Sequence, residues 1–279
     1  MKKNFTGLFT ILFVFSFSCI ISAQSGYNLK YNFEKGKSYK YSSITDGTIT
    51  QSMMGQEMKI GLESKIFLKM ETEDVMGDQF SLLVSIDSGK VRTSMPMKDT
   101  TISLNENEGK RTRIIVEKNG KVTKKEIVDT VMAGMEEMGS FGNEITKLVV
   151  LPDKEIKPGE TWNNTSVDSV VMMGGKILTT SNLDYTLAGK IDTLGYSCLV
   201  INFTGKTSSE GSAKIMGMDL FIEGNGKNSG KLYFAPAKGL IVFVDVILDN
   251  EMTMAATGEQ NMIIPISQSM KSKQTILDK

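Results

Sequence analysis

Gln79-Phe80-Ser81-Leu82-Leu83-Val84-Ser85-Ile86-Asp87 alternates apolar and polar side chains, and this stretch decides the fold class. Leu83 is the one apolar residue that breaks the alternation. A period of two is the pattern of an antiparallel strand with one buried face. Similar strand-like stretches follow one another through the chain, so the sequence predicts a mainly β protein.

The same series of landmarks occurs twice in the chain. The matched pairs are Gly36-Lys-Ser-Tyr39 with Gly159-Glu-Thr-Trp162, Met53-Met54-Gly55 with Met172-Met173-Gly174, Gly77 with Gly195, Gly89 with Gly205, Gly109-Lys110 with Gly230-Lys231, and Gly120 with Gly239. The offset stays between 116 residues (205 minus 89) and 123 residues (159 minus 36), a drift that surface turns tolerate. We expect two related antiparallel β units, half-barrel or sandwich-like, from an internal duplication. Whether they form separate domains or one closed sheet is open at this point.

This pattern divides the chain into four parts. Residues 1–23 are a signal peptide, 24–127 the first β repeat, 128–150 a linking helix, and 151–279 the second β repeat with a C-terminal hairpin. The helix is predicted because Val128, Val131, Met132, Met135 and Met138 recur at steps of three or four residues.

Turn residues place the hairpins. Asn119-Gly120 predicts a tight hairpin, and Pro236-Ala-Lys-Gly239 predicts a longer one before the strand 240–248. This strand is apolar on both faces except at Asp245, so it should be central or covered on its second side. In the C-terminal hairpin, Pro265 predicts an edge strand.

The first residues predict export. Met1-Lys2-Lys3 is positively charged, 8–21 is a short apolar run, and Ile21-Ser22-Ala23 supplies a small residue before the cut. We expect a periplasmic or secreted protein without a transmembrane segment after cleavage. Cleavage before Cys19 would instead give a lipid-anchored protein, although Ser16-Phe17-Ser18 lacks the small aliphatic pattern of a lipobox.

Composition excludes several functions. The mature chain carries 30 Lys and Arg (32 minus Lys2 and Lys3) against 32 Asp and Glu, which gives no electrostatic argument for nucleic acid. Histidine is absent, so Ser-His-Asp and Cys-His catalysis and His-ligated metals are excluded. Cys198, the one cysteine left after cleavage, is expected to be an inert core thiol. No cofactor is expected.

Two features leave alternatives open. Glu71, Glu73, Asp74 and Asp78 form the densest acidic group and would suit a carboxylate-based glycan hydrolase, or they decorate a solvated turn. The chain has 19 Met residues, which suit an adaptable apolar core or a cavity for an acyl-like ligand; Cu(I) is the weaker alternative.

The stretch Leu151-Pro-Asp-Lys-Glu-Ile-Lys-Pro-Gly-Glu-Thr-Trp162, with Gly230-Lys-Leu-Tyr-Phe and Gly239-Leu-Ile-Val, resembles an uncharacterised family of exported Bacteroidota proteins. This family has no catalytic residues to transfer. In architecture, long antiparallel strands with a covering helix are similar to periplasmic lipoprotein carriers, whose curved sheets hold acyl chains.

These observations predict a non-catalytic binding or envelope-associated protein that holds an apolar ligand, such as a lipid, against a curved sheet. The candidate lining residues are Phe80, Leu82, Val84, Ile86, Val242, Val244 and Val246. The alternatives are a scaffold that binds a protein partner of the cell envelope and, as a third class, the carboxylate-based hydrolase.

Overall fold

The computed structural model describes residues 26–53, 55–96, 98–105, 111–128, 148–172, 175–215, 218–257 and 261–277. These residues form strands and no helix. The strands are β1 (Ser38–Met53), β2 (Gln56–Met76), β3 (Gln79–Met95), β4 (Lys98–Asn105), β5 (Thr112–Glu117), β6 (Val122–Ile127), β7 (Thr161–Met172), β8 (Gly175–Thr193), β9 (Tyr196–Ile215), β10 (Met218–Ala235), β11 (Leu240–Thr257) and β12 (Met262–Ile276). The mainly β prediction is confirmed. The predicted signal peptide, and the helix over 128–150 except for its ends, lie outside the described residues.

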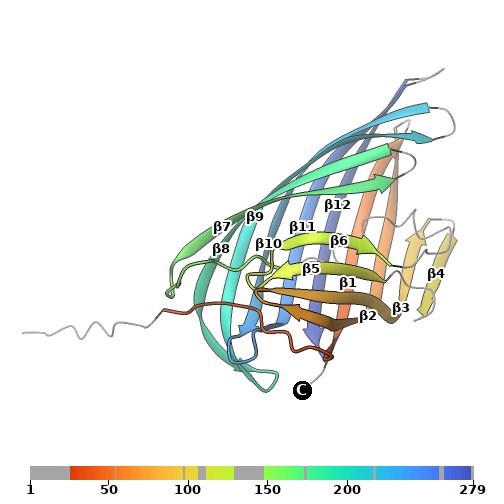
Figure 1. Ribbon diagram of the computed structural model, residues 1–279. Coiled ribbons are helices and arrows are strands. Elements are labelled where there is room, and N and C mark those ends of the chain that lie inside the picture. Colours follow the sequence, from red (N-terminus) through yellow and green to blue (C-terminus); the bar gives the residue numbers. More distant parts are fainter. Residues whose placement is uncertain are drawn as a thin grey trace, which may run out of the picture.

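All twelve strands belong to one antiparallel sheet (Figure 1). Its order is β6-β5-β3-β2-β1-β12-β11-β10-β9-β8-β7, and β4 pairs with β3 beside β5. The first half of the chain thus occupies one side of the sheet and the second half the other. Strand β12 lies between the halves and pairs with both β1 and β11.

The paired landmarks of the sequence occupy matching places in the two halves. Gly36 and Gly159 precede β1 and β7 with positive φ angles of 77° and 89°. The amide of Gly36 donates to the carbonyl of Thr72 on β2, and that of Gly159 donates to Leu187 on β8. The duplication that would explain this correspondence stays a prediction.

The two hairpins predicted from turn residues, at Asn119-Gly120 and at Pro236–Gly239, are confirmed. Gly120 joins β5 to β6 with a φ of 90°, and Gly239 joins β10 to β11 with a φ of 64°. Strand β11 is central, as predicted. The edge position of the strand with Pro265 was wrong, because β12 is flanked on both sides. Its pairing with β1 ends at Ile266, so the missing amide of Pro265 falls just beyond the ladder.

One face of the sheet, here called the inner face, carries the core. Segment 26–36 crosses it at one end, and Leu29, Tyr31 and Phe33 from this segment are buried there. Segment 148–160 adds Leu151 and Ile156. The end of the sheet that these segments cover is here called the near half, and the part beyond them the far half. Strand β2 alone has 21 residues, about 70 Å at 3.3 Å per residue, so the sheet extends well past this cover.

Candidate functional site

The seven predicted lining residues lie together on the inner face, in the near half. Phe80, Leu82, Val84 and Ile86 of β3 and Val242 of β11 are buried, and Val244 and Val246 are half-buried against the same cluster. The ring of Phe33 packs edge-on against Phe80 at 5.2 Å between centroids. These side chains belong to the packed core. Local alternation showed which side chains face inward, but it carried no signal that Phe33 from residues 26–36 would pack against Phe80.

The acidic group lies at the end of β2 and in the turn that follows, and each carboxylate has its own basic partner. Asp74 pairs with Lys35 at 2.8 Å, Asp78 with Lys118 at 2.8 Å, and Glu71 with Lys69 at 3.1 Å. These pairs are largely exposed, so each stabilises the fold little. They are the salt bridges of a solvated turn.

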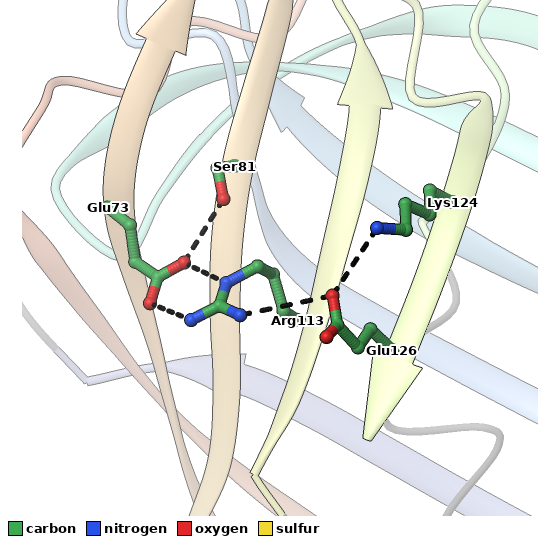
Figure 2. Close-up of polar contacts among 5 residues, drawn as sticks. All are labelled: Glu73, Ser81, Arg113, Lys124 and Glu126. Atoms are coloured by element: carbon green, nitrogen blue, oxygen red, sulfur yellow. Dashed lines mark hydrogen bonds and ion pairs between the residues drawn. The ribbon is translucent and has the colours of Figure 1, made fainter. Parts of the chain in front are cut away.

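Glu73 is the best connected of these carboxylates (Figure 2). Arg113 donates to both of its oxygens, with a distance of 2.9 Å from Nη2 to Oε1, and Ser81 donates to Oε2 at 3.1 Å. The hydrogen bonds from Arg113 lower the pKa of Glu73, and partial burial opposes them. A general acid needs a raised pKa, so this carboxylate does not have the environment of one.

Replacing Arg113 with Met is expected to lower the unfolding free energy at pH 7, because the half-buried Glu73 loses the guanidinium that donates to both of its oxygens. The folded pKa of Glu73 is depressed, so this stabilisation is present above its unfolded pKa and is lost as pH falls through the folded value. Urea titrations of wild type and variant should therefore converge in acid. Lys124→Met, which removes an exposed partner of Glu126, is the control and should change little. A difference in unfolding free energy between wild type and Arg113→Met that persists at pH 2 would contradict this account.

Beyond the core, the inner face of the far half carries a second, smaller apolar cluster. Leu220 and Ile222 of β10 and Ala256 of β11 are buried, and Met254 and Met262 are half-buried beside them. Strand pairing brings these residues into adjacent rows: Ala256 faces Leu220 and Met262, and Met254 faces Ile222 and Ile264. This group, with Ile264 and Ala213, is here called the end cluster. Among the described residues, strand residues alone form this cluster. Several of them belong to the C-terminal hairpin that the sequence predicted.

Methionine residues gather at the same end of the sheet. The strand ends there include Met53, Met95, Met172 and Met218, because the odd-numbered strands β1, β3, β7, β9 and β11 all run toward this end. Met95 is 41% exposed. Strand direction thus places these four residues at the end of the sheet that carries the end cluster.

The two faces of the far half differ in charge. Along β11 the inward residues are Leu248, Asn250, Met252 and Met254, whereas the outward neighbours include Asp249 and Glu251. The inward positions of β1, β9, β10, β11 and β12 in the far half, as far as the structure describes them, include no Asp, Glu, Lys or Arg. One face is therefore suited to water and the other to an uncharged neighbour.

The outer face carries one exposed apolar row. Phe221 of β10 is 53% exposed and Ile263 of β12 is 70% exposed, and both lie beside Ala255 of β11. A hollow of about 560 Å³ on this side is lined by mixed residues that include Glu57, Glu223 and Glu251. No group of three metal-binding side chains occurs among the residues described.

Likeness to solved structures is faint. The hypothetical lipoprotein YmcC from Escherichia coli (K12) is 11% identical with a TM-score of 0.25, over 80% of this chain and 85% of that one. An outer membrane channel from Pseudomonas putida F1 is 8% identical with a TM-score of 0.28, and the match covers 88% of this chain and 97% of that one. OccK11 (OpdR) from Pseudomonas aeruginosa is 6% identical with a TM-score of 0.22, over 90% and 100%. Scores this low carry no argument about fold or function.

No protein-family model matches the sequence, and no curated protein matches it. The family of exported Bacteroidota proteins therefore stays a prediction. Within the described residues, no helix is long and apolar enough to span a membrane.

Proposed function

We propose that this chain is a non-catalytic binding protein of the cell envelope that holds an apolar, acyl-like ligand on the end cluster of the inner face. The observation that carries the proposal is the separation of the inner face into two apolar clusters. The near one includes buried residues of segments 26–36 and 148–160, whereas the far one is formed, among the described residues, by residues of strands β9 to β12 alone. The ligand surface thus differs from the seven residues that the sequence suggested.

The residue types of the end cluster support this function. Met254 and Met262 have flexible, polarizable side chains, which adapt to apolar ligands of varied shape. The inward positions around them carry no charge that an acyl chain would have to desolvate. The predicted export signal would deliver such a protein to the envelope, where lipids are the abundant apolar molecules.

Adjacent residues of β11 provide a matched test. Met254 faces inward and is half-buried, whereas Thr253 faces outward and is exposed. We expect Met254→Lys to weaken binding of a pyrene-labelled acyl glycerol at least tenfold, because the ammonium group enters the apolar surface. Thr253→Lys should bind as wild type does. Fluorescence titration gives the affinities, and thermal melting verifies that both variants fold.

A protein partner is the second candidate occupant, favoured by the exposed row of Phe221 and Ile263 on the outer face. The same titration distinguishes an acyl-like ligand on the end cluster from a protein partner on the outer face. If wild type and Met254→Lys bind the probe equally, or neither binds it, the proposed ligand surface is wrong and the outer row becomes the better candidate.

A further inference from the structure

A band of polar side chains crosses the inner face between the core and the end cluster. It consists of Ser181, Thr207, Asn228, Asn250 and Gln268, here called the polar belt. Thr207 faces Ser181 and Gly226, Gly226 faces Asn250, and Asn250 faces Gln268, so four members share one row; Asn228 lies in the next row, beside Leu248. A polar row between two apolar clusters is not required by a simple core.

Two amide oxygens of the belt lack a hydrogen-bond partner. Asn228 Oδ1 and Asn250 Oδ1 are both buried, and no donor reaches either among the described residues. The amide nitrogen of Asn250 donates to Gln268 Oε1 at 3.3 Å, so one end of this side chain is held while the carbonyl end is unpaired. Buried acceptors without donors destabilise a protein, so both are expected to meet a donor when the site is occupied.

Glycine leaves space for one of these oxygens, that of Asn250. Gly226 lies across from Asn250, and a Cβ atom at Gly226 would overlap Asn250 Oδ1 and lie 2.6 Å from Thr207 Oγ1. The carbonyl of Asn250 thus lies over the inner face where a side chain of β10 would otherwise stand. Both unpaired oxygens belong to neighbouring rows of β10 and β11 on this face.

We propose that the ligand is a neutral amphiphile, whose hydroxyl or amide N–H donates to Asn228 and Asn250 while its acyl chain lies along the end cluster; this inference rests on the proposed function. A carboxylate or phosphate headgroup is disfavoured because the inward positions of these strands offer no Lys or Arg. From Asn250 to Ala256 is six residues, about 20 Å along the strand, which gives an extended acyl chain room.

Three ligands with the same chain test the headgroup. Monopalmitoylglycerol has donor hydroxyls, methyl palmitate has no donor, and palmitate is an anion. Each would compete with a pyrene-labelled acyl glycerol for wild-type protein. We expect monopalmitoylglycerol to bind about tenfold more tightly than either of the others, the effect of one well-made hydrogen bond in a buried site.

Substitutions then assign the donor contact. Asn228→Leu keeps the size of the side chain and should reduce the advantage of monopalmitoylglycerol over methyl palmitate to less than threefold, with methyl palmitate binding unchanged. Asn250→Leu is the second variant, and Asn225→Leu, on the exposed face of β10, is the control. Equal affinity for the three ligands, or tightest binding of palmitate, would overturn the headgroup inference and leave the proposed function standing. Failure of all three to bind would overturn both.

Discussion

Tyr31→Ala is expected to lower the unfolding free energy by about 3–5 kcal/mol, the usual cost of truncating a fully buried aromatic side chain. Tyr31 is 2% exposed; its ring stacks on Phe33 at 5.5 Å between centroids and meets Phe234 edge-on at 5.9 Å. Its position also joins the two halves of the sheet. The amide of Tyr31 donates to Lys118 beside β5, while the amide of Asn32 donates to Gly239 beside β11.

Denaturant titration measures this cost, and Tyr31→Phe is the matched control. The phenylalanine variant keeps the ring and removes the hydroxyl that donates to the carbonyl of Val149 at 2.9 Å, so it should lose about 1 kcal/mol. A loss below 1 kcal/mol for Tyr31→Ala would show that residues 26–36 do not stabilise the core.

Gly205→Val is expected to have a comparably large effect, about 3 kcal/mol, for a different reason. Gly205 faces inward on β9, and a Cβ atom there would overlap the carbonyl oxygen of Asn182 and lie 2.8 Å from Cα of Leu183. Both obstacles are backbone atoms of β8, so no side-chain rotation relieves them. The variant must spread two strands that pair along most of their length.

The matched control for Gly205→Val is Thr204→Val, whose side chain is exposed on the opposite face of the same strand. Valine suits strands, so the control should be neutral or slightly stabilised. Thermal melting of both variants gives the comparison, with a fall of roughly 10 °C for Gly205→Val. Equal melting temperatures would mean that the strands do not approach as closely as described.

Several other glycines lie at similarly close approaches on this face. Gly224, Gly226 and Gly230 of β10 and Gly211 of β9 also face inward, with neighbouring strands or side chains where a Cβ would be. Their shared face emerges only from the register of the pairing.

Local sequence patterns predicted the strands and turns, because these depend on residues that are close in the sequence. Alternation in Phe80–Ile86 predicted a strand with one buried face, and Asn119-Gly120 predicted a tight hairpin, because side-chain direction and turn conformation are fixed within a few residues. The pairing of β1 with β12 could not be predicted, because Tyr41 and Ile276 are neighbours in the sheet but lie far apart in the sequence. The edge strand predicted from Pro265 was wrong for the same reason, because the sequence shows the missing amide but not where the pairing with the neighbouring strand ends.

The proposed site differs in position from the surface that the sequence suggested. Apolar inward residues and flexible Met side chains suggested a surface for an apolar ligand, but the chosen valines and Phe80 belong to the core cluster, in which Phe33 packs against Phe80. The end cluster draws its residues from four strands and the polar belt draws one residue from each of five, and only the register aligns them in rows. The unpaired oxygens of Asn228 and Asn250 have no sequence signature.

The central claim is that the inner face of the far half holds an acyl-bearing ligand. Native mass spectrometry of the protein purified after export from its own cells tests it most directly, because a retained ligand adds its mass to the protein. The account predicts a neutral lipid mass on wild type and on Thr253→Lys that is absent from Met254→Lys. Bare protein mass for all three, or the same added mass on all three, would contradict it.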